Sequence, residues 1–309
     1  MSDDSAVADI SIICGPTGAG KSSLAMQLAR RHGLHVLSAD SRQVYRGFDI
    51  GTAKPSRADM AAVTHHAIDI ADPTERWSAA LWATRARTVL AENGNRRVVV
   101  VGGTGLYLRA LTTAFFTEPS LDGERRRALA GALADLSSDE LRRWVEHLDP
   151  SRAQLGRTQL LRAVEVALLT GRRLSDWHRE APDVGGLRAR WLVVDPSEAL
   201  QARLEQRLST MLEAGWLDEV RDLARRIPPA APAWLACGYH ALLSVAEGFR
   251  TLEDARTSIL IATRQYAKRQ RTWFRHQLPA DEGRVTRLDP RDPDCEALVE
   301  AWWRTGEST

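Results

Sequence analysis

The feature that most constrains this chain is the stretch "GPTGAGKSS" at residues 15–23, which contains the pattern G-x-x-x-x-G-K-[ST]. The apolar run "DISIIC" precedes it and the helix-prone stretch "SSLAMQLARRH" overlaps its end. Such glycines let the backbone curl until successive N–H groups point at one anion, and the dipole of the following helix adds to that field. The sequence therefore predicts a phosphate-binding loop between a strand and a helix, without indicating whose phosphates it holds.

Two side chains of this loop have expected roles. Lys21 is suited to neutralise outer phosphate oxygens, and Ser22 is suited to hold Mg²⁺. Only Lys21, Lys54 and Lys268 are lysines among 42 basic residues, which favours a need for a compact point charge at Lys21. A Walker-B-like carboxylate is poorly defined. Asp40 and Asp195 each end a strand candidate, and "DPSEALQARLEQR" makes a turn or helix cap the better interpretation of Asp195.

The N-terminal part alternates between strand and helix patterns. Strands are expected at 9–14, 35–39, about 66–70 and 97–102, and helices near 21–32, 78–93 and 104–113. This alternation predicts an α/β fold, a P-loop NTPase-like parallel sheet flanked by helices. Ligands bind at the carboxyl ends of such strands, so the P-loop, Asp40 and "GGTG" should meet at one edge.

From about residue 118 the strand signal disappears and several arginine-rich amphipathic helices follow, until "RWLVVD" returns to strand character near 190. We therefore predict a catalytic core of residues 1–117 and 188–309 with an all-helical insertion at 118–187. The rest of the core is expected to be helical, with "IPPAAPAW" as a rigid break.

Composition excludes several classes of protein. A net charge of +2 with 44% hydrophobic residues is typical of a globular chain, and no apolar stretch approaches the roughly 20 residues that span a bilayer. The acidic N-terminus resembles no targeting peptide. Three scattered cysteines argue against a disulfide framework or a cysteine-based zinc site, and Cys14 is expected to be a buried hydrophobe. We expect a cytoplasmic monomer that does not bind membranes.

The polar loop "SADSRQVYRGFDIGTAKPS", residues 38–56, follows a strand. Asp40 would project beside the P-loop, where it can take a proton from an incoming nucleophile; the alternative is a turn residue. Ser41, Arg42 and Gln43 suit a base edge or a sugar. In "VGGTGLYLRAL", Thr104 is expected to cap the next helix while offering its hydroxyl to the cleft, with a helix cap alone as the alternative.

A second basic region lies near the C-terminus, in "TRQYAKRQRTWFRHQ". Arg264, Lys268, Arg271 and Arg275 form one stripe along a helix, whose opposite face should bury Ile259, Ala262, Tyr266 and Trp273. The insertion adds Arg125, Arg126, Arg127, Arg142 and Arg143. Together these favour a nucleic-acid backbone as partner over an ordinary solvated basic face.

Taken together, the motifs resemble the tRNA dimethylallyltransferases, also called isopentenyl-pyrophosphate transferases. The matching segments are "GPTGAGKS", "DSRQVYRGFDIGTAKP", "HHAIDI", "GGTGLYL", "LLRAVEV", "MLEAGWLDEVRDL", "CGYHAL" and "ATRQYAKRQRTWFR", in order from residue 15 to about 275. The P-loop alone is generic, typical of ATP-binding proteins. The second and last segments are specific to the family.

The resemblance implies transfer of a dimethylallyl group from dimethylallyl diphosphate to N6 of the adenosine beside the tRNA anticodon, with Mg²⁺ and release of diphosphate. It implies a catalytic set of Asp40 as general base, Thr17, and Arg221 as a further diphosphate contact. The implied diphosphate-binding residues are Gly15, Thr17, Gly18, Ala19, Gly20, Lys21 and Ser22, with Ser22 also on the metal.

The resemblance also implies the tRNA contacts. Asp40, Ser41, Arg42, Gln43 and Thr104 would hold the flipped adenine, a base whose extrusion costs a few kcal/mol. The remaining implied contacts, with the anticodon stem-loop, are Arg127, Gln159, Leu160, Leu161, Arg162, Ala163, Cys237, Gly238, Tyr239, His240, Lys268, Arg269, Arg271 and Arg275. "LGRTQ" departs from an Asn-Asp pair frequent in the family, and the zinc-finger tail of eukaryotic relatives is absent, so the chain resembles the bacterial type.

Three alternatives remain at this point. A kinase or other NTPase would turn over ATP and use the insertion as a lid. A prenyltransferase acting on free adenine nucleotides would need neither the insertion nor the basic helix. An RNA-binding protein with a relic P-loop would not need Lys21 and Ser22 intact.

Overall fold

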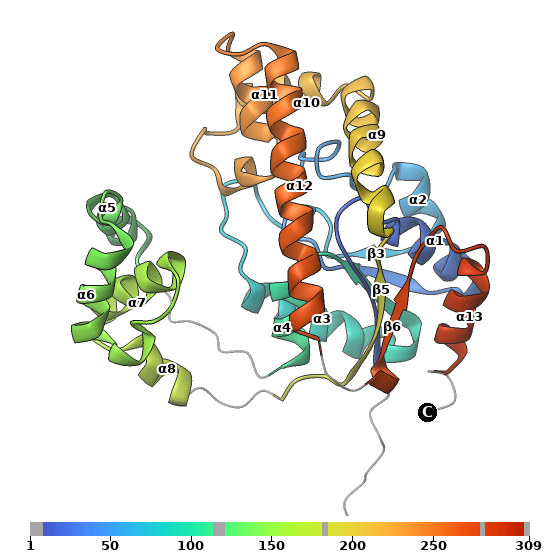
Figure 1. The fold of residues 1–309 in the computed structure, drawn as a ribbon, viewed down its shortest axis with the longest axis horizontal. Helices are drawn as coiled ribbons and strands as arrows, with labels where there is room; N and C mark the ends of the chain where they lie inside the picture. Colours follow the sequence, from blue (N-terminus) through green and yellow to red (C-terminus); the bar gives the residue numbers. More distant parts are fainter. Residues whose placement is uncertain (1–8, 114–120, 181–184, 279–281, 306–309) are drawn as a thin grey trace, which may run out of the picture. The chain divides into compact units, whose positions relative to one another are not determined.

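The computed structural model describes residues 9–113, 121–180, 185–278 and 282–305 (Figure 1). Its contacts divide the chain into two compact units. The core unit comprises residues 1–113 and 186–309, and the insertion unit comprises residues 114–185. The expected boundary at residues 117 and 118 lies outside the described residues.

The core unit is built on one six-stranded parallel sheet in the order β3-β2-β4-β1-β5-β6. The strands are β1 (Ile10–Cys14), β2 (His35–Ser38), β3 (His65–His66), β4 (Val98–Gly102), β5 (Ala189–Val194) and β6 (Val285–Leu288). β1 and β4 are buried along their whole length, as strands covered on both faces must be. Cys14 pairs with Gly102, so β1 and β4 end level with each other at one edge of the sheet.

Helices cover both faces of this sheet, which confirms the expected α/β class. The helices of the core unit are α1 (Lys21–His32), α2 (Arg57–Ala62), α3 (Ala79–Asn93), α4 (Gly105–Thr112), α9 (Leu200–Glu213), α10 (Trp216–Arg226), α11 (Tyr239–Ala246), α12 (Leu252–His276) and α13 (Cys295–Thr305). Leu28 of α1 and Trp303 of α13 belong to one hydrophobic cluster with the sheet. Trp82 of α3 stacks on Tyr107 of α4 and donates to the carbonyl of Ser38 at the end of β2.

Two details of the sheet differ from expectation. The strand expected at about 66–70 is only the two-residue β3, and the C-terminal part contains β6, where only helices were expected. Both are edge strands, and β6 is exposed at Thr286 and Arg287, so it lacks the apolar run that marks a buried strand. Cys14 is fully buried, as expected, and burial raises the pKa of its thiol above the usual range.

The long helix α12 packs against α9, α11 and α4 (Figure 1). Its buried face carries Ala255, Ile259, Ala267, Gln270 and Phe274. The expectation for Ile259 is confirmed and the expectation for Ala262 is wrong, because Ala262 is exposed. Tyr266 and Trp273 are only partly buried. The face is rotated from the expected one because a polar residue, Gln270, points inward.

The insertion unit is all-helical in its described part, with α5 (Gly123–Leu133), α6 (Ser138–Leu148), α7 (Arg157–Thr170) and α8 (Leu174–Glu180). Leu133, Leu141, Val145, Leu160 and Val164 form its core. The fully buried carboxylate of Asp149 accepts from the Ser175 N–H at 2.9 Å and the Ser151 hydroxyl at 2.9 Å, which ties the end of α6 to the start of α8.

Candidate active site

The loop between β1 and α1 has the backbone of a phosphate-binding loop. Gly15, Gly18 and Gly20 all have positive φ, and Gly20 directly precedes α1. A Cβ on Gly15 would lie 2.1 Å from the Val194 carbonyl oxygen, so only glycine lets the loop pass the end of β5. The Lys21 ammonium donates to the Pro16 carbonyl at 2.7 Å, which holds it across the loop.

This loop forms one wall of a cleft of about 530 Å³. Of the residues expected to bind diphosphate, those that line this cleft are Thr17, Gly18, Gly20, Lys21 and Ser22. Asp40 and Gln43, in the 38–56 loop that follows β2, also line it. Ala19 is fully buried and does not line the cleft. Gly15 does not line the cleft, and its contribution is to let the loop pass the end of β5.

The opposite wall contains two arginines that the sequence did not single out, Arg203 and Arg207 of α9. Arg203 donates to the Gly18 carbonyl at 3.1 Å and so contacts the P-loop directly. Burial lowers the pKa of Arg207, while the charge of Asp40 acts in the opposite direction. Burial lowers the pKa of Lys21 to about 8, and the positive charge of Arg207 contributes to that shift.

The structure does not bring Arg221, which was expected to reach the diphosphate, to the phosphate cleft. Arg221 lies on α10, its side chain is 51% exposed, and it pairs with Asp218 of its own helix at 2.8 Å. It lines neither this cleft nor the cavity beside it. Arg207, in "LEQRL", holds the position over the P-loop that was expected for Arg221.

Asp40 lies in a turn, which was one of the two alternatives, and its expected role as a base stays a prediction. Its carboxylate accepts from the N–H groups of Arg42, at 2.8 Å, and Gln43, at 3.4 Å, so it does form a turn. It also lines the cleft with Lys21 and Arg207, so the turn aims it at the phosphate site.

Thr104 begins α4 but makes no side-chain capping bond, which excludes a cap alone. Its hydroxyl accepts from the Ser41 N–H at 3.1 Å, and its side chain lies beside the Tyr266 phenol, whose pKa it lowers. Burial raises the pKa of Tyr266 to about 12, so this hydroxyl stays protonated. The loops that follow β2 and β4 are thereby joined beside the cleft.

Two polar side chains hold the 38–56 loop in shape. The Gln43 amide accepts from the Ser38 hydroxyl at 2.8 Å and donates to the carbonyls of Thr52 and Ala53. Gln43 is thus engaged within the protein, which limits the expected role in reading a base. Lys54 is nearly buried, with 4% of its side chain exposed, and donates to the Tyr45 carbonyl and to two carboxylates.

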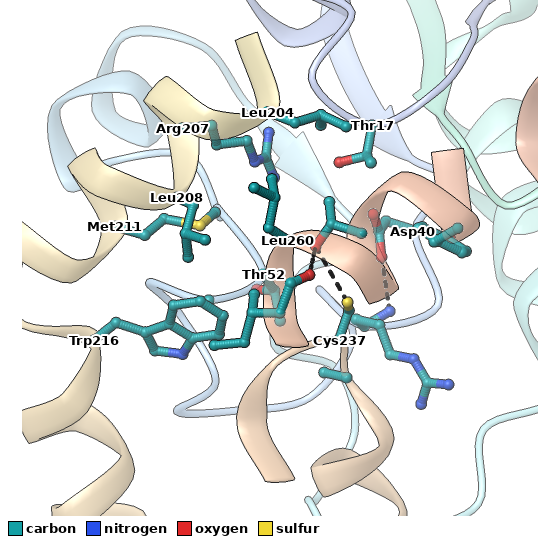
Figure 2. A pocket seen from close by; sticks show the side chains of 16 residues that line it. Thr17, Asp40, Thr52, Leu204, Arg207, Leu208, Met211, Trp216, Cys237 and Leu260 are labelled. Carbon is teal, nitrogen blue, oxygen red and sulfur yellow. Dashed lines mark hydrogen bonds between the residues drawn. The ribbon is translucent and has the colours of Figure 1, made fainter. Parts of the chain in front are cut away.

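An apolar cavity of about 80 Å³ adjoins the phosphate cleft. Its apolar wall consists of Leu204, Leu208, Met211, Trp216, Ile259 and Leu260, and Thr17, Asp40 and Arg207 line it as well. Figure 2 shows Leu208, Met211 and Trp216 on one side of it, opposite Thr17 and Asp40. A hydrocarbon group attached to a phosphate held by the P-loop would have a matching place here.

The basic stripe of α12 is partly neutralised within the protein. Arg264 pairs with Glu205 at 2.5 Å, and Arg271 makes a bidentate pair with Asp195, at 2.7 Å for the shortest contact. Asp195 also accepts from the Ser197 N–H, so the turn interpretation of Asp195 is confirmed. Lys268, Arg269 and Arg275 remain exposed.

Several side chains expected at the tRNA are placed elsewhere. Tyr239 is fully buried and donates to Glu219 at 2.6 Å, and Leu160 and Ala163 lie in the core of the insertion unit. Five consecutive residues of a helix cannot all face one partner, so some side chains of 159–163 point into the core and others point to the surface. Gln159 and Arg127 are exposed, Leu161 is half-buried and packs on that core, and Arg162 pairs with Glu165. Cys237 lines the apolar cavity, His240 is exposed, and Gly238 lies against Trp216.

The fold and cleft define a class: a P-loop protein whose phosphate-binding loop lines a cleft beside an apolar cavity. The family model described as IPP transferase matches residues 43–277, and the model described as isopentenyl transferase matches residues 8–76. The chain belongs to this family, the tRNA dimethylallyltransferases, which are prenyltransferases. The resemblance read from the motifs is thereby confirmed.

Individual relatives agree. A tRNA dimethylallyltransferase of Caulobacter sp. (strain K31) is 40% identical over 290 residues, which cover 91% of this chain and 94% of the relative. The solved tRNA delta(2)-isopentenylpyrophosphate transferase of Staphylococcus epidermidis superposes with a TM-score of 0.69 at 28% identity, covering 97% of this chain and 100% of its own. A solved eukaryotic dimethylallyltransferase acting on tRNA superposes with a TM-score of 0.74 at 26% identity. The match covers 95% of this chain and 77% of the eukaryotic chain.

Proposed function

We propose that this protein transfers the dimethylallyl group of dimethylallyl diphosphate to N6 of the adenosine beside the anticodon of tRNA and releases diphosphate. The observation that carries the proposal is the junction of two spaces that share Thr17, Asp40 and Arg207. One is a cationic cleft for two phosphates, and the other is an apolar cavity of about 80 Å³. A ligand with a diphosphate head and a short hydrocarbon tail matches both.

The chemistry requires a leaving group to be stabilised. As the C–O bond to the diphosphate breaks, negative charge grows on the departing oxygen and an allylic cation forms. Lys21, Arg207 and the N–H groups of the P-loop are positioned to hold the diphosphate, so its negative charge develops in a preorganised field. The apolar wall excludes water from the cation and leaves the amine as its acceptor.

The amine that attacks must lose a proton. An exocyclic amine of adenine is a weak nucleophile, so a carboxylate that takes this proton assists the transfer. We assign that role to Asp40, and its position in the lining of both the cleft and the apolar cavity supports the assignment. The backbone N–H groups of Arg42 and Gln43 fix its orientation.

We include Mg²⁺ in the proposal. Mg²⁺ prefers oxygen ligands and is commonly held by a few protein oxygens together with phosphates. The exposed hydroxyl of Ser22 lines the cleft next to Lys21 and fits that donor set. Among the described residues no cluster of three or more His, Cys, Asp or Glu side chains could hold a metal by itself. The ion would supply additional positive charge to the diphosphate.

For the second substrate we propose the anticodon stem-loop of tRNA. The exposed cations that we propose for its phosphates include Lys268, Arg269 and Arg275 of the core unit and Arg127 of the insertion unit. We further propose a monomer that acts in the cytoplasm, where tRNA is found. In the part of the chain that the structure describes, no helix is both long and apolar enough to span a membrane.

A mass measurement on tRNA tests the proposal. The protein is incubated with Mg²⁺, unmodified tRNA bearing an adenosine beside the anticodon, and dimethylallyl diphosphate, with ATP in a parallel reaction. The expected result is one five-carbon unit on a single adenosine, with ATP inert. Consumption of ATP with no mass gain would replace this proposal by the kinase alternative. Modification of free adenosine monophosphate but not of tRNA would favour the nucleotide-specific alternative.

A further inference from the structure

Gln270 is a buried glutamine at the junction of two functional loops. It lies on α12, and only 7% of its surface is exposed. Its side-chain carbonyl accepts from the Thr17 N–H in the P-loop at 2.8 Å. Its amide NH₂ donates to the Gly103 carbonyl, in the loop after β4, at 2.8 Å. One planar amide thus joins the loop after β1 to the loop after β4.

The surroundings of Gln270 fit this side chain closely. A Cβ added to Gly103 would lie 2.3 Å from the Gln270 amide nitrogen and 3.1 Å from the Gly15 carbonyl oxygen. Glycine at 103 is therefore what lets the amide enter between the two loops. The bridge needs one acceptor and one donor at fixed places, and the side-chain amide of glutamine supplies both in one planar group.

The same face of α12 holds a third loop. Tyr266 lies one helical turn before Gln270 and interacts with the Thr104 side chain, whose hydroxyl accepts from the Ser41 N–H. Gln270 therefore holds the phosphate-binding loop, while Tyr266 lies beside Thr104 of the loop after β4, which is bonded to the loop that carries Asp40. Both residues belong to one helix, which also carries the exposed Lys268 and Arg275.

We propose that Gln270 is a positioning residue that sets the P-loop, through Thr17, at the distance from Asp40 that the transfer requires. The proposal rests on the function proposed above. Loss of the bridge would leave the Thr17 N–H and the Gly103 carbonyl without their buried partner, so the P-loop could shift. A displacement of about 1 Å of a bound reactant is enough to cost on the order of 100-fold in rate.

The experiment uses Gln270→Glu and Gln270→Leu. An ionised glutamate can accept from Thr17 but cannot donate to Gly103, and its charge repels diphosphate. A protonated glutamate has one O–H donor and one carbonyl acceptor, as the bridge needs. We therefore expect Gln270→Glu to lose roughly 10- to 100-fold in kcat/KM for dimethylallyl diphosphate near pH 8. Relative to wild type, the loss should shrink as pH falls toward about 5.5, because burial raises the pKa of such a carboxyl.

Gln270→Leu should lose activity to a similar extent with no recovery at low pH. Gln265→Glu is the matched control, because it adds the same charge to an exposed position of the same helix, and its kcat/KM for dimethylallyl diphosphate at saturating tRNA should match wild type. The affinity for tRNA should stay within about twofold of wild type in both Gln270 variants, since Gln270 is buried. If Gln270→Leu does not fold, the pH recovery of Gln270→Glu decides the question alone.

Two outcomes would overturn the inference. One is a folded Gln270→Glu protein with wild-type kcat/KM near pH 8. The other is a loss that is the same at every pH, which would indicate a merely structural role. Binding of inorganic pyrophosphate to the wild type distinguishes a failure of the Gln270 inference from a failure of the proposed function. If the wild type neither binds pyrophosphate nor prenylates tRNA, the function is wrong; if it does both, only the bridge is in question.

Discussion

Lys21 of the P-loop and Arg207 of α9 place two positive charges on opposite walls of one cleft. Burial lowers the pKa of Lys21 to about 8, and repulsion from Arg207 adds to that shift, while Asp40 and Cys14 oppose it. The repulsion between these two cations destabilises the protein when no ligand is bound, and an anion between them would reduce it. The affinity for diphosphate is therefore expected to depend on the proton of Lys21.

The sign of this dependence can be derived. A bound diphosphate stabilises the charged amine and raises its pKa above about 8, so binding is accompanied by proton uptake. Below pH 8 the amine is already charged; above it, the dissociation constant for pyrophosphate should rise by up to about tenfold per pH unit. Calorimetry in buffers of different ionisation enthalpy measures this uptake. Lys21→Arg, which stays charged, should abolish the dependence, and equal affinities at pH 7 and 9.5 would contradict the prediction.

Arg207 and Arg221 provide a matched pair of substitutions. Arg207→Gln removes a partly buried cation that lines the cleft with the P-loop and should weaken pyrophosphate binding by about 10- to 100-fold, as expected for a hydrogen-bonded charge. Arg221→Gln removes a half-exposed cation paired on its own helix and should leave binding within about twofold. Titration with pyrophosphate measures both. If Arg221→Gln had the larger effect, the assignment made from the geometry would be wrong.

These two arginines show how far the sequence could predict the site. The P-loop was recognisable because its signature is local, and the α/β fold followed from the alternation of strands and helices. Arg207 had no such signature: "LEQRL" resembles any amphipathic helix, and its position over the P-loop depends on how α9 packs. Gln270 was missed for a related reason, since a glutamine within a basic helix is expected at the surface. Tyr239, Leu160 and Ala163 lie in segments assigned to tRNA contact, but a segment does not reveal which of its side chains point inward.

The Asp40→Asn variant distinguishes the proposed role of Asp40 as a base from its role in the turn. An asparagine side chain can still accept from the N–H groups of Arg42 and Gln43, so the loop should keep its shape. It cannot take a proton, and the single-turnover rate should fall by about 10²- to 10⁴-fold, the usual contribution of a general base. The affinity for pyrophosphate should not fall, because a negative charge leaves the cleft. An unchanged single-turnover rate would remove Asp40 from the proton transfer.

Charges on α12 should divide into those that bind tRNA and those that hold the fold. Lys268→Gln with Arg275→Gln removes two exposed cations and should lower tRNA affinity. If each contacts one phosphate, the slope of log affinity against log salt should decrease by about 0.7 to 0.9 per cation removed. Arg271→Gln instead breaks the bidentate pair with Asp195, which should lower the melting temperature while leaving the salt slope unchanged. Since that pair is about one-third exposed, its contribution to stability should be about 1 kcal/mol or less. Filter binding over a range of salt concentrations and thermal melts of both variants measure the two effects, and an unchanged slope in the double variant would place the tRNA elsewhere.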